Sequence, residues 1–252
     1  MTRSAEISTR IVQAVLARQI EPGSRLGEQQ LADLFDCSRT IVREALTNLA
    51  ARGIVTVSAR RGWFVAEPSR DDTREAFEAR LVIETGLIRS TRSVDKAAVK
   101  RLRAHIDQQK NAIKSDDIAL RSFLLGDFHV CLAECLGNGT LAEILRDLTA
   151  RTTLAARRYQ TLEDATRSHE EHAEVVEALA AGNIAAAERL VSGHLSTWQD
   201  KLHIPAEDSD AVDRLRRALK PMPVEARNLH TRPLGQTDQK RQRLRSRSGG
   251  AS

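Results

Sequence analysis

The segment at residues 37–49, CSRTIVREALTNL, constrains the structure of this chain more than any other stretch. Ser38 can cap the start of a helix, because the first backbone N–H groups of a helix have no acceptors within it. The apolar residues that follow recur at helical spacing on a single face: Val42, Ala45, Leu46 and Leu49. The pattern predicts a short amphipathic helix whose apolar face lies in a core.

The other face of this predicted helix carries two arginines and two threonines: Arg39, Thr40, Arg43 and Thr47. Guanidinium groups donate paired hydrogen bonds to guanine or phosphate, and threonine offers a hydroxyl and a methyl group. Such a face suits a groove of DNA. An ordinary amphipathic surface helix has the same spacing, so this segment alone leaves both interpretations open.

The residues before this helix predict two further helices, at 7–20 and 28–35, separated by a turn at Pro22-Gly23. A tight connection at residues 36–38 joins the second of them to the arginine-bearing helix. Two short helices joined in this way form a helix-turn-helix, whose second helix normally enters the major groove of DNA.

After Gly53 the apolar period changes to two, which predicts strands at 54–57 and 63–65 around a turn at 58–62. Such a hairpin forms a wing beside the helix-turn-helix. Arg60 and Arg61 lie at its tip, where they can reach phosphates or the minor groove. A solvated turn with incidental charge is the alternative, and the neighbouring arginine-bearing helix argues against it.

Residues 7–67 resemble the winged helix-turn-helix of the GntR family of bacterial transcription regulators. The PG-x-x-L turn, the LA-x-x-F helix, the SRT-x-VREAL segment and the G-x-FV wing carry the resemblance. It implies DNA contacts at five positions: Arg39, Thr40, Arg43, Arg61 and Gly62. Gln29 is a departure, because family members often carry a DNA-contacting arginine there. The departure implies a different operator preference or a missing phosphate contact.

Beyond a linker at residues 68–70 the sequence shows helical periodicity and no strand pattern. Six segments separated by short breaks fit this periodicity: 71–91, 94–114, 116–136, 140–160, 163–181 and 183–203. Short connections between helices imply an antiparallel bundle. The region resembles the FadR C-terminal domain (FCD), a ligand-binding domain that follows many GntR-type winged helices. The matching pieces are RLVIE at 80–84, FH at 128–129, GN at 137–138, EH at 171–172 and HL at 194–195.

Three histidines lie on apolar faces of three predicted helices: His129, His172 and His194. An isolated histidine in such a place is usually a core residue, but three in one bundle suggest a shared site. Imidazole nitrogens bind zinc and other divalent transition metals, and three ligands leave a position for water or an anion. Without a metal, the same imidazoles can donate hydrogen bonds to an acidic effector.

The resemblance to the metal-binding branch of the family implies an aspartate one turn before His129, but that position is Leu125. Asp127 lies about 200° around the helix from His129 and should therefore point elsewhere. His169, one turn before His172, is a substitute to consider. Whether the site binds a metal is therefore left open.

The resemblance further implies a small carboxylic or sugar acid as effector. Arg80 stands at the position of a family arginine that can pair with such a carboxylate. A surface pair with Glu84, four residues on, is the other interpretation of Arg80. Arg157 and Arg158 are weaker candidates for the same role.

The formal charge of +5 is unevenly placed, since residues 204–252 hold 11 Lys/Arg and 6 Asp/Glu, which is a balance of 11 − 6 = +5. This tail has little apolar periodicity and is expected to be a disordered basic segment, so the high pI says little about the folded part. A basic run at residues 240–248 offers non-specific phosphate contacts as an alternative role.

Neither a signal peptide nor a membrane-spanning stretch of about 20 apolar residues is evident. The odd count of three cysteines fits a reducing cytoplasm better than a disulfide framework. Cys131 and Cys135 are one helical turn apart, and we expect them in the core rather than on a metal.

We therefore predict a mainly α protein with a winged helix-turn-helix at 1–67, an antiparallel six-helix effector-binding and dimerisation domain at 71–203, and a basic tail at 204–252. Its expected function is that of a cytoplasmic, homodimeric transcription regulator, a repressor that binds a palindromic DNA operator. A helical-bundle metalloenzyme is the rival interpretation, but no carboxylate shares the three-histidine face as a general base. A metal-independent effector domain is the third.

Overall fold

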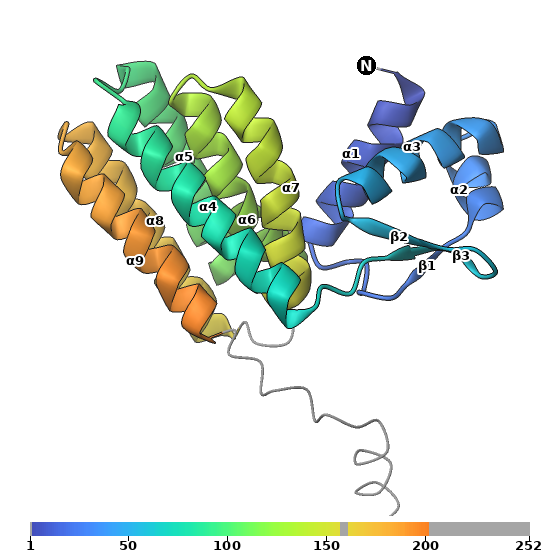
Figure 1. Ribbon diagram of the computed structural model, residues 1–252. Coiled ribbons are helices and arrows are strands. Elements are labelled where there is room, and N and C mark those ends of the chain that lie inside the picture. The colour runs from blue at the N-terminus through green and yellow to red at the C-terminus, as the bar shows by residue number, and fades with distance from the viewer. Residues whose placement is uncertain (1, 157–160, 202–252) are drawn as a thin grey trace, which may run out of the picture. The chain divides into compact units, whose positions relative to one another are not determined.

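The structure, a computed structural model, describes residues 2–156 and 161–201. This part of the chain is mainly helical, with a small three-stranded sheet near the N-terminus (Figure 1). The N-terminal elements are α1 (Arg3–Leu16), β1 (Arg25–Leu26), α2 (Glu28–Leu34), α3 (Arg39–Ala51), β2 (Val55–Ser58) and β3 (Gly62–Val65). Their order confirms the predicted winged helix-turn-helix. The predicted tail and the candidates Arg157 and Arg158 lie outside the described residues.

Helix α3 forms as its sequence dictates. The hydroxyl of Ser38 accepts a hydrogen bond from the backbone N–H of Ile41 at 3.4 Å and so caps the helix. The four apolar residues of the predicted face are fully buried in the core of the N-terminal domain: Val42, Ala45, Leu46 and Leu49. The arginine-bearing face is left exposed to solvent.

The wing is the hairpin of β2 and β3, with Ser58 opposite Gly62. Gly62 has a φ of +91°, a left-handed conformation that glycine adopts without the penalty a Cβ would bring. Strand β1 adds a third, antiparallel strand to the free edge of β3, so the strand order is β1-β3-β2. The sequence gives no sign of β1, because two residues are too few to show a period.

The remaining helices are α4 (Arg70–Ser90), α5 (Lys96–Lys114), α6 (Ile118–Cys135), α7 (Gly139–Ala156), α8 (Leu162–Ala180) and α9 (Ile184–Lys201). They lie side by side in Figure 1, where α4 packs against α7 and α9, and α5 packs against α6 and α8. The predicted helical bundle is confirmed. Within residues 2–156 and 161–201, no helix is both long and apolar enough to cross a membrane.

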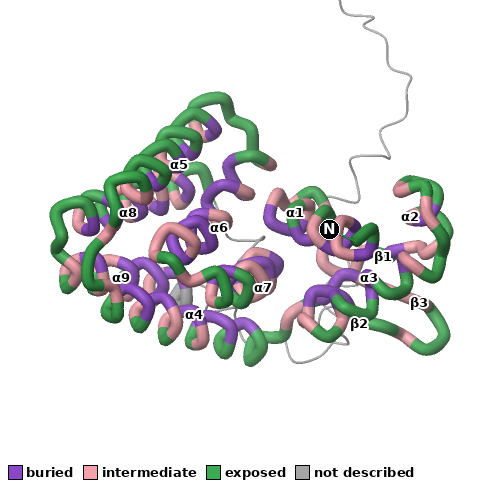
Figure 2. Tube along the Cα trace, turned by 90° about the horizontal axis from the view of Figure 1, so that it is seen from above, coloured by how far each residue is buried: buried purple, intermediate pink, exposed green. Residues whose placement is uncertain are grey.

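Helix α6 lies inside the bundle, in contact with α4, α5, α7 and α8, and most of its length is buried (Figure 2). Its sequence is apolar on nearly every side, which is typical of a helix enclosed by others. Capping boxes fix the starts of two of the surrounding helices, through Ser69 and Asp72 at α4 and through Thr161 and Asp164 at α8. Side chains that α4, α8 and α9 turn inward therefore meet those of α6 in the interior.

Candidate functional site

One carboxylate, that of Glu28 at the start of α2, holds both arginines of the exposed face of α3. Arg39 donates to Glu28 Oε2 at 2.9 Å, and Arg43 donates to Oε1 and Oε2 at 3.1 and 2.9 Å. The two arginine side chains nevertheless stay 59% and 61% exposed. The indole N–H of Trp63 on β3 donates to Glu28 Oε1 at 3.0 Å. Glu28 therefore joins the arginine-bearing face of α3 to the wing.

These bonds change the acidity of the carboxylate. Hydrogen bonds from Arg43, Arg39 and Trp63 stabilise its ionised form and lower the pKa of Glu28 to about 2. The sequence pattern did not identify Glu28, because an acidic residue in the first turn of a helix is ordinary in itself.

The other residues predicted to contact DNA lie around this centre. Arg39, Arg43 and Gly62 line one groove together with Glu28 and Trp63. Thr40 is exposed at the start of α3, and Arg60 and Arg61 are exposed at the tip of the wing. The guanidinium of Arg61 lies 5.7 Å from the ring centre of Phe64. Gln29, the departure from the family pattern, bonds to Asp33 within its own helix.

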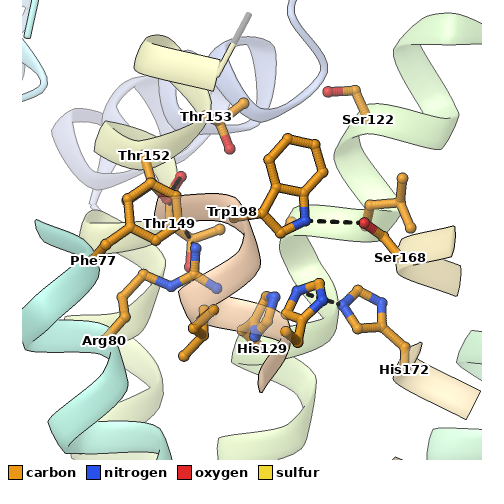
Figure 3. A pocket seen from close by; sticks show the side chains of 14 residues that line it. Phe77, Arg80, Ser122, His129, Thr149, Thr152, Thr153, Ser168, His172 and Trp198 are labelled. Atoms are coloured by element: carbon orange, nitrogen blue, oxygen red, sulfur yellow. Dashed lines mark hydrogen bonds between the residues drawn. The ribbon is translucent and has the colours of Figure 1, made fainter. Parts of the chain in front are cut away.

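A second candidate site is a small cavity of about 70 Å³ inside the helical bundle. Residues of α4, α6, α7, α8 and α9 line it, among them Phe77, Arg80, Leu125, Thr149, Thr152, Trp198 and the three histidines. Figure 3 shows Arg80, His129 and His172 turned toward the same space. The structure therefore brings together the four predicted effector-binding residues, which are far apart in the sequence.

The three histidines form one compact cluster. His129, His172 and His194 are 3%, 1% and 5% exposed, and one ring nitrogen of each lies within 4.8 Å of the others. The Nε2 atoms of His172 and His194 are 3.2 Å apart. Among the residues that the structure describes, this is the only group of three or more potential ligand side chains close enough to share an ion.

Each histidine is held from behind by an acceptor on another helix. The Nδ1 atoms of His129 and His194 lie 2.6 Å from carboxylate oxygens of Glu84 and Glu171, and Nδ1 of His172 lies 3.3 Å from the amide oxygen of Gln109. A carboxylate or amide oxygen only accepts, so each Nδ1 carries a hydrogen, and a ring in its neutral form keeps a lone pair on Nε2. The Nε2 atoms of His172 and His194 thus face each other.

This arrangement fits a bound cation. Two nitrogen ligands at ~2.0–2.1 Å from one tetrahedral zinc ion lie roughly 3.3 Å apart, close to the separation observed here. Hydrogen bonds from the outer imidazole nitrogen to a carboxylate are typical of metal-bound histidine. Burial lowers the pKa of His129 to about 4, with Arg80 adding to the shift, and burial lowers the pKa of His172 as well. Both rings are therefore neutral near pH 7, the form that binds metal.

Arg80 forms the predicted pair with Glu84, but in the interior of the bundle. It lies 4% exposed on α4, where its Nε donates to Glu84 at 3.0 Å and its Nη1 donates to Thr152 at 2.9 Å. The pair with Glu84 is therefore buried and not at the surface. Within the described chain, its Nη2 and the hydroxyl of Thr149 have no hydrogen-bond partner, although both residues line the cavity. Buried donors of this kind are costly, so they indicate a place for an acceptor.

Of the remaining predictions near this site, some are confirmed and one is wrong. Asp127 points away from the cluster toward His105, as its angle predicted, and Leu125 lines the cavity. His169 is not part of the three-histidine group, so its suggested role as a substitute ligand is wrong. Cys131 is in the core and Cys135 packs against it, as expected.

Both parts of the chain are similar to known bacterial regulators. A family model described as bacterial regulatory proteins of the gntR family matches residues 3–65, and the FCD domain model matches residues 75–197. The HTH-type transcriptional regulator LutR of Bacillus subtilis is 28% identical over 73% of this chain and 94% of its own. The HTH-type transcriptional repressor RspR of Escherichia coli is 26% identical over 76% of this chain and 85% of its own.

A solved structure shows the same fold. The transcriptional regulator GntR from Rhodococcus sp. RHA1 superposes with a TM-score of 0.71 at 23% identity, over 80% of this chain and 98% of that one.

The geometry of Glu28 predicts an unusual titration. Carbon-13 NMR of the glutamate carboxyls should show Glu28 titrating near pH 2, because the bonds from Arg43, Arg39 and Trp63 hold its pKa there. Its folded pKa lies below the ordinary 4.5, so its contribution to stability is complete above pH 4.5 and is lost as the pH falls toward 2. In Arg43→Ala the midpoint should move toward 4.5, whereas Arg10→Ala, which removes an exposed arginine of α1, should leave it unchanged. A wild-type midpoint near 4.5 would contradict the arrangement.

Proposed function

Since its two parts match the family models, this chain belongs to the GntR family of bacterial transcription regulators with an FCD domain, and we propose specific roles for the residues of its two sites. Members of this family bind DNA through the winged helix-turn-helix and an effector through the FCD domain, and they are regulators rather than enzymes. The chain is therefore a DNA-binding transcription regulator. The metalloenzyme interpretation has no support.

The recognition helix α3 supplies the base contacts in this proposal. Arg39, Thr40 and Arg43 lie on the exposed face of α3. From this face an arginine can donate two hydrogen bonds to one guanine in the major groove. Arg60, Arg61 and Gly62 of the wing contact the backbone or the minor groove. Glu28 supports these roles, because it holds the two α3 arginines in extended, exposed positions before DNA arrives.

The proposal includes a homodimer acting in the cytoplasm, where the DNA of a bacterium lies. Two recognition helices related by a twofold axis match two half-sites of a palindromic operator, about 34–36 Å or one helical turn apart. The effector then changes operator affinity by binding one arrangement of the dimer better than the other. Repression is the proposed direction of control, in line with the relative RspR, which is named a repressor.

His129, His172 and His194 would hold a divalent transition metal such as zinc. The observation that carries this proposal is the 3.2 Å between Nε2 of His172 and Nε2 of His194, the separation of two nitrogens that bind one cation, while the Nδ1 atom of each ring faces an acceptor. A metal ion there would act as a Lewis acid that attracts an anionic group of the effector. The imidazoles of the three histidines would also orient this anionic group of the effector within the cavity.

A metal-independent effector site is the second candidate function of this cluster. Leu125 favours it, because the aspartate that this position carries in the metal-binding branch is absent. In this case the imidazoles themselves would bond to the acid.

The effector in this proposal is a small carboxylic or sugar acid. Its carboxylate would accept a hydrogen bond from the free Nη2 of Arg80 and another from the hydroxyl of Thr149. The apolar part of the molecule would lie against Phe77 and Trp198, which line the same cavity. A cavity of about 70 Å³ restricts the ligand to a few heavy atoms unless the bundle opens.

Arg43→Ala should weaken binding to the operator by roughly 1–3 kcal/mol, about 5- to 150-fold in Kd, if the arginine bonds to guanine through two donors. The operator would first be selected from genomic fragments with wild-type protein, and Kd measured by electrophoretic mobility shift. Arg103→Ala, which removes an exposed arginine of α5, is the control and should bind as wild type. An unchanged shift with Arg43→Ala would count against the assigned face.

Purified protein should contain about one equivalent of zinc or a related metal per chain after dialysis against that metal, measured by plasma mass spectrometry. His172→Ala should lose most of it, because it removes one of three ligands. His169→Ala is the matched control, since this partly buried histidine of α8 lies outside the cluster. Equal metal content in all three proteins would rule out the proposed ligands.

Thermal-shift screening of small carboxylic and sugar acids, with and without zinc, should find an acid that stabilises the wild-type protein. At 100 times its Kd, such a ligand adds about 2.7 kcal/mol to the free energy of unfolding. Arg80→Met should abolish the ligand-dependent shift, and Arg89→Met on the exposed part of the same helix should keep it. A shift of equal size in Arg80→Met would exclude Arg80 as the carboxylate partner.

A further inference from the structure

A fourth buried histidine, His105, lies outside the three-histidine cluster and is connected to it by hydrogen bonds. His105 on α5 is 7% exposed, and its Nε2 lies 3.4 Å from Asp127 Oδ2 on α6. Its Nδ1 lies 3.1 Å from Nε2 of Gln109, one turn further along α5. The amide oxygen of Gln109 in turn lies 3.3 Å from Nδ1 of His172. A continuous chain of hydrogen bonds thus leads from a partly exposed carboxylate to one of the proposed metal ligands.

The donor-to-acceptor direction of this series of hydrogen bonds is fixed at both ends. Asp127 can only accept, so Nε2 of His105 carries the hydrogen and Nδ1 accepts from Gln109. The backbone oxygen of Leu124, 3.5 Å from Nε2 of Gln109, also only accepts, which places the amide nitrogen on this side. The amide oxygen of Gln109 must then face His172. Every bond therefore donates outward, toward Asp127.

We propose that Gln109, oriented by His105 and Asp127, is the positioning residue that holds His172 in the tautomer with its Nε2 lone pair directed at the metal. This inference rests on the proposed metal site. If the amide were reversed, its N–H would face Nδ1 of His172, which would then have to accept. The hydrogen of His172 would move to Nε2, and a nitrogen that carries a hydrogen cannot bind a metal.

His172 is the ligand for which such control matters most. His129 and His194 each bond directly to a carboxylate at 2.6 Å, whereas His172 has a neutral amide at 3.3 Å. A carboxylate acts as an acceptor whichever way it turns, but an amide has one accepting end and one donating end. The tautomer of His172 is therefore set by the orientation of Gln109, and that orientation by the residues beyond it.

Substitution of Gln109 tests this role through metal affinity and ring tautomer. In Gln109→Leu the zinc affinity, measured by competition with a chromophoric chelator, should fall by about 10- to 100-fold. Nitrogen-15 NMR of the metal-free protein should show His172 with hydrogen on Nδ1 in wild type and a mixture of tautomers in the variant. Gln109→Glu, which keeps an acceptor toward His172, should retain the wild-type tautomer and most of the affinity.

Two further variants separate positioning from damage to the fold. Gln108→Leu changes the exposed neighbour of Gln109 on α5 and should behave as wild type. Asp127→Asn alters only the partly exposed end of the hydrogen-bond chain, where it replaces an obligate acceptor with an amide that can either accept from His105 or donate to it, and so weakens the constraint on the direction of the bonds. It should therefore lower zinc affinity even if Gln109→Leu does not fold.

The outcomes distinguish this inference from the proposal beneath it. If wild-type protein binds no zinc, the metal site fails and the inference fails with it. If wild type binds zinc and both Gln109→Leu and Asp127→Asn bind it equally well with an unchanged His172 tautomer, the metal site stands and the positioning role is overturned.

Discussion

The outer nitrogen of each imidazole in the cluster is bonded to an acceptor on a neighbouring helix, and these three bonds organise the polar interior of the bundle. Burial removes the rings from water, and a buried N–H without an acceptor costs about 1–3 kcal/mol. Glu84, Gln109 and Glu171 meet this need. Because all three acceptors lie outside the cluster, the inner nitrogens face one another. The bonds that make the buried histidines tolerable therefore also bring together the nitrogens of the proposed metal site.

In the DNA-binding domain the carboxylate of Glu28 is the acceptor that organises the polar side chains around it. Ordering a long side chain on binding costs about 0.5–1.5 kcal/mol, and in the proposed DNA complex Glu28 would remove part of that cost by holding Arg39 and Arg43 in advance. It would also compete with DNA for the same donors and place a negative charge near the phosphates. Orientation of the arginines would thus be obtained at some expense in affinity, an exchange that favours discrimination between sequences over tight non-specific binding.

Features that depend on spacing within one helix could be predicted from the sequence, and features that depend on neighbouring helices could not. The buried face of α3 and the inward faces of the three histidines follow from residues three or four apart. The bond between Gln109 and His172 joins residues 63 apart, and that between Glu28 and Arg43 joins residues 15 apart. Periodicity shows that a face is buried but not which helix covers it. For this reason the helical angle correctly predicted that Asp127 points away from the cluster, but the sequence pattern did not identify its partner, His105.

Leucine at position 125 leaves the proposed metal site with one ligand fewer and with a higher positive charge. An aspartate ligand would cancel one of the two charges of the ion, whereas three neutral imidazoles cancel none. The nearest carboxylates lie behind the histidines, where they accept hydrogen bonds from the outer ring nitrogens. One of them, Glu84, also pairs with Arg80. The cavity would therefore hold an ion of nearly full charge beside a guanidinium with a free donor. Such a space would exclude neutral ligands less by shape than by the cost of leaving the charge of the ion uncompensated and Nη2 of Arg80 without an acceptor, so the loss of the anionic ligand itself favours an anionic effector.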